Sequence, residues 1–109
     1  MKTYQGITNE SGCLVQIKDG NVTHELPLKL DVRKLTDDGF SWGEIDARSA
    51  QLSLALLCDA LQDDEKALQS YQAYMFEIIS KLPKNDSWEL TELQIHAGFE
   101  LASSRRYFY

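Results

Sequence analysis

Alternating apolar and polar positions in the first third of the chain predict a small β-sheet. Cys13, Val15 and Ile17 recur at every second position and predict one strand, and residues 2–8 can supply another. Between Ile17 and the next pattern, Asp19-Gly20-Asn21 predicts a tight turn, because Gly and Asn tolerate positive φ. After the turn, every second position as far as Val32 carries an apolar residue or His24. These residues are Val22, His24, Leu26, Leu28, Leu30 and Val32. This is one half-buried strand, or two strands divided near Pro27, which cannot donate a ladder hydrogen bond.

A loop and a very apolar helix come next. Two Gly and several cap-prone residues make 36–48 a loop, which Phe40 and Trp42 anchor in the core. Residues 49–61 are so apolar that they predict a helix buried on most sides, with Ser49 as its cap. Its narrow polar edge consists of Gln51, Ser53 and Asp59.

Two further helices follow. Apolar residues at spacings of three and four predict a helix over 64–82, capped by Asp63. The last helix begins after Thr91, because Thr91 and Gln94 have the spacing of a capping box, and it runs to about Ser103. The fold class is therefore α+β: a small antiparallel sheet of three to four strands, followed by three helices packed on one face.

Length and composition agree with this plan. The chain has 109 residues, 43% of them apolar and 26% charged, with no repeat or linker, so residues 1–109 are expected to form a single globular domain. The longest apolar run, 54–58, is too short to span a membrane. No leader pattern follows Met1, so the expected location is the cytoplasm.

Residues able to hold a metal or act as nucleophiles are few. Cys13, His24, Cys58 and His96 lack the short spacings of a zinc site, so neither a metal nor a cofactor is predicted. His24 falls on the apolar face of its strand, where a hydrogen-bonded core histidine is the plainer interpretation. Cys58 lies in an apolar helix, where a thiolate is costly. No catalytic residue is predicted, and enzymatic activity stays uncertain.

Charge is the strongest remaining signal. Seventeen acidic and eleven basic residues give a net charge of -6, which argues against direct binding of nucleic acid. Residues 37–65 alone hold eight acids and one base. If these acids share one face, they can bind a basic partner, and the plainer alternative is a solvated surface with helix caps. The candidate partner-binding acids are Asp37, Asp38, Glu44, Asp46, Asp63, Asp64 and Glu65.

Two other segments are candidate binding sites. The tail Arg105-Arg106-Tyr107-Phe108-Tyr109 either folds back onto the body or forms an interface, including one between copies of the chain. The 39–49 loop leads into a helix start and is a possible small-molecule or nucleotide pocket with Trp42, Gly43 and Ser49. Glu44 and Asp46 beside it would repel an anion.

Several short runs resemble one known family. They are Met1-Lys2-Thr3-Tyr4-Gln5-Gly6, Gly39-Phe40-Ser41-Trp42-Gly43, Ala50-Gln51-Leu52-Ser53-Leu54-Ala55, Tyr71-Gln72 and Trp88. Together they resemble domain of unknown function 6166, found in short bacterial, archaeal and phage proteins. The family usually carries a Gly-rich loop between the Trp and the Ala-Gln, where this chain has Glu44 to Ser49. The resemblance implies this architecture and a prokaryotic or mobile-element origin, and no activity.

These observations favour a non-catalytic interaction or regulatory protein. We expect it to bind a protein partner with a basic surface, and neither a nucleic acid nor a membrane. Its narrowest form is an inhibitor of a nucleic-acid-binding host defence complex, with Asp63, Asp64 and Glu65 facing the basic surface. The alternative is a small-molecule or nucleotide-binding domain that uses the 39–49 loop.

Overall fold

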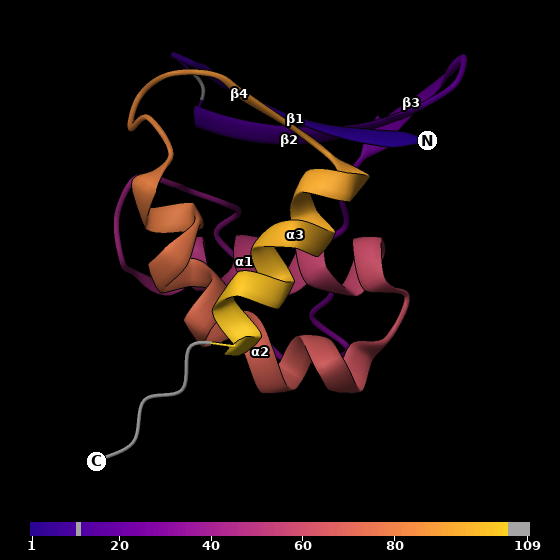
Figure 1. The fold of residues 1–109 in the computed structure, drawn as a ribbon. Coiled ribbons are helices and arrows are strands. Elements are labelled where there is room, and N and C mark those ends of the chain that lie inside the picture. Colours follow the sequence, from indigo (N-terminus) through magenta and orange to yellow (C-terminus); the bar gives the residue numbers. More distant parts are fainter. Residues whose placement is uncertain (11, 105–109) are drawn as a thin grey trace.

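In the computed structural model, four strands form one antiparallel sheet in the order β3-β2-β1-β4 (Figure 1). β1 (Lys2–Asn9) pairs with β2 (Gly12–Asp19), which pairs with β3 (Val22–Glu25). β4 (Trp88–Thr91) comes from far along the chain and pairs with the other side of β1. β1 is therefore a central strand, although it begins at the second residue.

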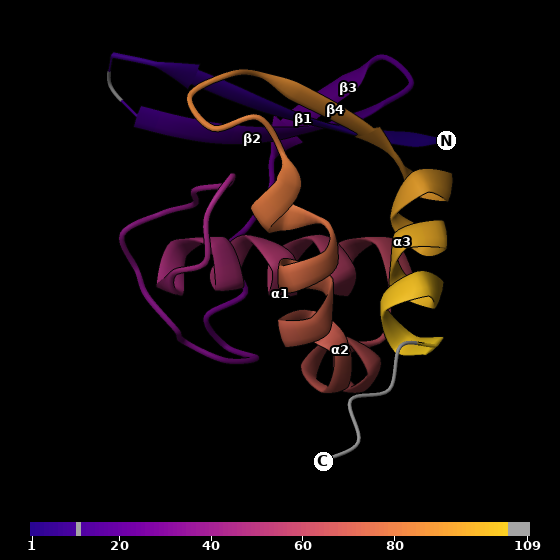
Figure 2. The same ribbon diagram turned by 60° about the vertical axis from the view of Figure 1, so that its left-hand side comes forward.

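Three helices and a 3₁₀ turn complete the described residues, which are 1–10 and 12–104. These elements are α1 (Ala47–Leu61), α2 (Asp64–Glu77), η1 (Ile79–Lys81) and α3 (Glu92–Ser104). Figures 1 and 2 both show the helices beneath one face of the sheet, while no helix covers the other. The structure confirms the α+β fold class. None of the helices in the described ranges could cross a membrane.

The core lies between the sheet and α1. Tyr4, Val15 and Ile17 point from the sheet toward the helices and are buried, and α1 is buried along most of its length. At the far end of the sheet, the indole of Trp88 lies across Gly6, its partner in the ladder. Trp42 meets Trp88 edge to face, with 5.5 Å between ring centroids, and so ties the loop before α1 to the sheet.

The prediction of a strand for the second half of residues 22–33 is wrong. β3 ends at Glu25, and residues 26–36 form neither strand nor helix, because their backbone groups bond to a helix side chain described below. His24, predicted on an apolar face, is exposed, because β3 is an edge strand and all four of its residues are exposed. β4 was not predicted as a strand, because it is short and depends on pairing with β1.

Helix boundaries also differ from the prediction. α1 begins at Ala47, because the Asp46 carboxylate caps it, and Ser49 donates its backbone N–H to that cap. α2 ends at Glu77, and a 3₁₀ turn replaces the predicted helix up to 82. The cap of α2 by Asp63 and the Thr91–Gln94 capping box are both confirmed.

Candidate functional site

The 26–36 segment lies against α1 and is held there by one buried side chain, that of Gln51. Gln51 has no exposed surface. Its amide bonds four backbone groups: the N–H of Leu35 at 2.8 Å, the N–H of Thr36 at 3.1 Å, and the carbonyl oxygens of Leu28 at 2.7 Å and Arg33 at 3.0 Å. Both amide hydrogens and both lone pairs of the amide oxygen are thus used. One residue of α1 therefore fixes the path of a segment that has no regular structure of its own.

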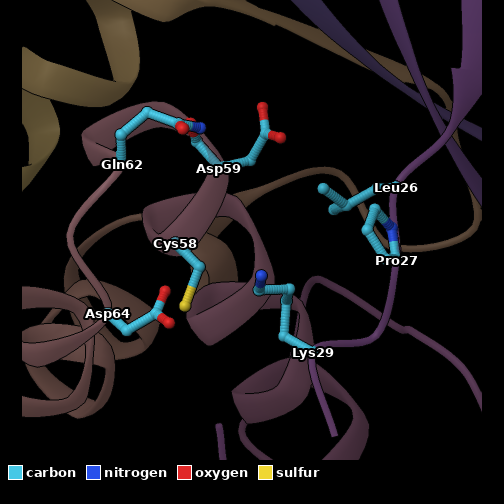
Figure 3. A pocket seen from close by; sticks show the side chains of 7 residues that line it. All are labelled: Leu26, Pro27, Lys29, Cys58, Asp59, Gln62 and Asp64. Atoms are coloured by element: carbon cyan, nitrogen blue, oxygen red, sulfur yellow. The ribbon is translucent and has the colours of Figure 1, made fainter. Parts of the chain in front are cut away.

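The beginning of this segment forms one wall of a hollow, and the turn from α1 into α2 forms the other (Figure 3). The hollow has a volume of about 340 Å³. The 26–36 segment contributes Leu26, Pro27 and Lys29, and the helical side contributes Cys58, Asp59, Gln62 and Asp64. We call it the corner hollow. It combines two carboxylates, one ammonium group and one thiol.

Two residues with left-handed backbone conformation lie in these walls. Lys29 has φ 61° and Gln62 has φ 53°. Gln62 ends α1 by donating its backbone N–H to the carbonyl of Cys58. Its side chain donates to the carbonyl of Asp59 at 2.6 Å, which satisfies a second free carbonyl of the helix end. The corner therefore has a defined conformation in which Cys58, Asp59 and Asp64 lie near one another.

The thiol of Cys58 stays protonated at neutral pH. Burial raises the pKa of Cys58 to about 12, and a hydrogen bond to Asp64 acts in the same direction. The ammonium group of Lys29 opposes the shift but does not cancel it. Because the thiolate is the nucleophilic form, Cys58 is not a competent nucleophile in this environment.

The carboxylate of Asp59 accepts hydrogen bonds from two side chains of β1. One of its carboxylate oxygens accepts a hydrogen bond from the Tyr4 hydroxyl and another from Lys2 Nζ at 3.2 Å. Burial, together with this bond to Asp59, raises the pKa of the Tyr4 phenol, so it stays a donor. Asp59 thus links β1 to the end of α1. Of the two carboxylates in the hollow, Asp64 is the one that does not bond to the sheet.

The structure divides the predicted acids into two groups at opposite ends of α1. Asp37, Asp38, Glu44 and Asp46 belong to the segment that enters α1, and Asp63, Asp64 and Glu65 follow its end. Fifteen helical residues separate the ends by about 22 Å. The acids are therefore two separate surfaces, and the second one borders the corner hollow.

Several of these acids already have partners within the fold. Asp46 and Asp63 cap α1 and α2. Burial alone would raise the pKa of Asp46, but hydrogen bonds from Ser49 and Ser41 outweigh it, and the pKa is lowered. Asp37 pairs with Lys34 at 3.2 Å and Glu44 with Lys84 at 3.3 Å, both on the surface. Asp64 and Glu65 remain exposed in the first turn of α2.

The loop predicted as a small-molecule pocket is packed into the body. Trp42 is 2% exposed and donates its indole N–H to the carbonyl of Asp86 at 3.0 Å. Ser49 is fully buried against Ser41. Gly43 has φ 77°, and a Cβ there would lie 2.7 Å from the Lys84 side chain. A pocket with Trp42, Gly43 and Ser49 stays a prediction, and the side chains proposed to line it are occupied by internal contacts.

The remaining sequence-based candidates lie elsewhere. Arg105, Arg106, Tyr107, Phe108 and Tyr109 fall outside the described residues. Within residues 1–10 and 12–104, no group of three or more His, Cys, Asp or Glu is arranged to hold a metal. His96 bonds the carbonyl of Ala60 through Nε2 at 3.0 Å and links α3 to α1. Cys13 is exposed and Cys58 is buried, and both are free.

Sequence reasoning missed the corner hollow as a unit. It considered Cys58 and Asp59 as parts of a helix and Pro27 as a strand interruption, and it gave Lys29 and Gln62 no role. The available signal was the short junction between two helices, where Gln62 ends the first helix in place of the usual Gly and Asp63 and Asp64 begin the next.

Comparison with known proteins gives a family and no activity. A family model described as "Family of unknown function (DUF6166)" matches residues 4–100. The chain belongs to the DUF6166 family. No curated protein and no solved structure matches the chain. The DUF6166 match includes Gln51, the corner hollow and both groups of acids, and it carries no functional description for any of them.

Proposed function

We propose that this DUF6166 protein is a non-catalytic binding protein that holds a basic surface of a protein partner at the α1–α2 corner. The observation that carries the proposal is the placement of Asp64, which is exposed in the first turn of α2 while its carboxylate lines the corner hollow (Figure 3). Glu65 lies beside it and is also exposed. A Lys or Arg side chain of the partner would enter the hollow and pair with Asp64.

The corner suits a long basic side chain in two respects. Leu26 and Pro27 offer apolar contact for its methylene groups, since such side chains bury their stems and keep the charge at a polar end. The positive end of the α2 dipole lies at Asp64 and Glu65, a position that suits acidic side chains.

The chemistry of the hollow favours binding over catalysis. Its thiol, Cys58, has a pKa raised to about 12 by burial and is therefore not a nucleophile at neutral pH. Asp59, its other carboxylate, accepts hydrogen bonds from Lys2 and Tyr4. The thiol of the hollow is thus protonated and one of its two carboxylates is engaged within the fold, which leaves Asp64 as the carboxylate that can pair with a partner.

The proposal has a narrower form. In it, the protein acts in the cytoplasm of a prokaryotic cell, encoded by a phage or another mobile element, and the partner's basic surface normally binds nucleic acid. Carboxylates at the corner would occupy the positions of phosphates and inhibit a host defence complex. The resemblance to short bacterial, archaeal and phage proteins and the net charge of -6 support this form.

The test uses a fluorescein-labelled nine-arginine peptide as the probe and anisotropy as the readout. We expect the protein to bind the peptide more weakly as salt rises, because exposed charges are screened over about 10 Å at 0.1 M ionic strength. Replacement of Asp64 and Glu65 by Lys is expected to weaken binding by about tenfold or more. Thermal unfolding of each variant checks that it folds.

The matched control changes the same charge at the other end of α1. Asp37 and Asp38 are exposed, and replacing both by Lys alters the net charge by the same amount as the corner variant. Binding within about twofold of the original protein is expected for this control. If both variants lose the same affinity, binding depends on net charge alone and the proposed corner site is refuted.

A further inference from the structure

The corner hollow presents two charges of opposite sign that have no ion-pair partner among the described residues. Lys2 pairs with Asp59 at 3.2 Å, so the open negative group is the carboxylate of Asp64. The open positive group is the ammonium of Lys29. Both groups line the hollow, yet they do not pair with each other. A ligand that matches this site therefore carries one charge of each sign.

The thiol of Cys58 lies between the two open charges (Figure 3). It donates a hydrogen bond to Asp64, and the Lys29 ammonium group acts on it electrostatically. Asp64 belongs to α2, whereas Lys29 belongs to the 26–36 segment. The two charges thus stand on opposite walls of the hollow, with a neutral group between them.

The ammonium group of Lys29 forms no ion pair within residues 1–10 and 12–104. Four other lysines in this range do pair with a carboxylate, namely Lys2, Lys34, Lys81 and Lys84. Lys29 is also partly buried, and a charge that loses water without gaining a partner destabilises a protein. An anionic group of a bound partner would supply the missing contact.

The backbone at Lys29 is fixed in a left-handed conformation, with φ 61°. The carbonyl oxygen of Lys29 accepts the backbone N–H of Val32 at 3.1 Å and that of Arg33 at 3.3 Å. The carbonyl of Leu28, just before it, is bonded by Gln51. Gly and Asn adopt this conformation more easily than Lys does. The fold therefore keeps a lysine where an asparagine would fit the backbone better.

The second wall of the hollow repeats this feature. Three non-glycine residues of the described chain have positive φ: Lys29, Gln62 and Asn85. Asn tolerates this conformation, whereas Lys and Gln do not favour it. Lys29 and Gln62 both line the corner hollow. Because residues in costly backbone conformations concentrate at functional sites, the side chains at these two positions are the ones to which a binding role belongs.

From this arrangement we infer that Lys29 is a specificity-determining residue of the corner hollow, and that the partner presents an acidic side chain next to the basic one that pairs with Asp64. The inference rests on the proposed function, since it concerns the same site and the same partner. A purely basic segment would bring a second cation near Lys29 and be repelled. A segment with both signs of charge satisfies both walls, and the difference between the two affinities is the specificity.

Two fluorescein-labelled peptides of equal length test the inference on the full chain, with anisotropy as the readout. One consists of Arg-Asp-Gly repeats and the other of Arg-Asn-Gly repeats, so they differ only in their acidic side chains. Lys29→Asn should weaken binding of the Arg-Asp-Gly peptide by about fivefold and strengthen binding of the Arg-Asn-Gly peptide by about twofold. The ratio of the two affinities should thus change by about tenfold.

The matched control removes the same charge elsewhere. Lys18 is exposed on β2 and does not line the hollow. Lys18→Asn should therefore leave the ratio of the two affinities unchanged. If Lys18→Asn and Lys29→Asn change this ratio equally, or if neither changes it, the role of Lys29 is overturned.

Thermal unfolding separates this role from a structural one. Because Asn fits a φ of 61° better than Lys, Lys29→Asn should unfold at no lower temperature than the original protein. If the variant folds poorly, Lys29→Gln takes its place in the peptide assay, since Gln62 shows that Gln is accepted in this conformation. A variant that loses stability while the ratio of affinities stays constant would assign Lys29 to the fold and overturn the inference.

The nine-arginine peptide distinguishes the failure of this inference from that of the proposed function. If that peptide binds and loses affinity when Asp64 and Glu65 are replaced by Lys, the corner site stands. An unchanged ratio in Lys29→Asn then overturns only the role of Lys29. If neither the nine-arginine nor the Arg-Asp-Gly peptide depends on Asp64 and Glu65, both proposals are refuted.

Discussion

The side-chain amide of Gln51 donates a 2.7 Å hydrogen bond to the carbonyl oxygen of Leu28, across 23 positions of the chain. This bond and three others from the same side chain fix the 26–36 segment against α1. The segment supplies one wall of the corner hollow, so the candidate binding site depends on a residue that does not line it.

Gln51→Met should destabilise the protein by about 2–4 kcal/mol. The replacement has similar volume but leaves four backbone groups without a partner, and buried polar groups that lose their partner cost about 1–3 kcal/mol each before water or local rearrangement compensates them. Urea unfolding measures the change. Gln72→Met, on the exposed face of α2, should change stability by less than about 0.5 kcal/mol. Equal effects of the two replacements would contradict the role assigned to Gln51.

Cys13 and Cys58 should differ sharply in reactivity toward a thiol reagent such as a disulfide-exchange dye. At pH 8 the native protein should react at the exposed Cys13 alone, because Cys58 is buried and burial raises its pKa to about 12. In denaturant both thiols should react. Reaction of two thiols per chain in the native protein, with Cys13→Ser removing only one, would show that the corner hollow admits the reagent and ionises Cys58.

The same raised pKa predicts a loss of stability in alkaline solution. The unfolded chain releases the Cys58 proton near pH 9 and the folded protein only near pH 12, so ionisation favours the unfolded state between these values. The stabilisation that the protonated Cys58 thiol gives the folded protein is fully present below pH 9. At pH 10 it has fallen by about 1 kcal/mol. Comparison with Cys58→Ala from pH 8 to 10 isolates it, because the variant should lack this part of the pH dependence. Parallel pH profiles for the two proteins would argue against it.

Asp46→Ala should destabilise the protein by about 1–2 kcal/mol, whereas Asp46→Asn should keep most of the stability. Asp46 caps α1 by accepting the backbone N–H of Ser49 at 2.8 Å, and Asn caps helices about as well as Asp. The lowered pKa of Asp46 means that its charged form is stabilised by folding. This contribution is present above the unfolded-state pKa near 3.8 and is lost as pH falls through the folded-state pKa. Thermal unfolding at pH 7 and pH 3 measures both effects, and an Asn variant as unstable as the Ala variant would contradict the capping role.

Gly6→Ala should lower the free energy of unfolding by more than about 2 kcal/mol, because a Cβ at this position would lie 2.2 Å from the Trp88 indole. The strain belongs to one pair, so Trp88→Leu should relieve part of it. The stability of Gly6→Ala with Trp88→Leu is therefore expected to exceed the value obtained by adding the two single changes. Additive effects in chemical denaturation would show that the two residues do not compete for the same space.

Local signals in the sequence predicted the elements that depend on local chemistry. The Asp63 cap and the Thr91–Gln94 capping box need only residues three positions apart, and both form as predicted. The Gly20 turn was found for the same reason, since its φ of 64° is a property of one residue. The negative charge that follows the C-terminal end of α1 was also visible in the sequence, because Asp63, Asp64 and Glu65 are adjacent.

Non-local contacts account for what the sequence could not show. Gln51 and Ser53 were interpreted as a polar edge of a helix, but both are buried and bond backbone groups at least 15 positions away. β4 is a strand because β1 offers it a ladder, and nothing in four residues reveals that partner. The corner hollow likewise joins Pro27 and Asp64, which are distant in sequence and meet only after folding.

The pairing of β1 with β4 has a consequence for synthesis on the ribosome. Thr3 pairs with Thr91, so β1 leaves the exit tunnel long before β4, the strand with which it forms its second ladder. β1 and β2 can form a hairpin early, but the sheet gains its fourth strand only after the helices α1 and α2 have also been synthesised. A chain truncated before Trp88 would therefore expose the flank of β1 as an open edge.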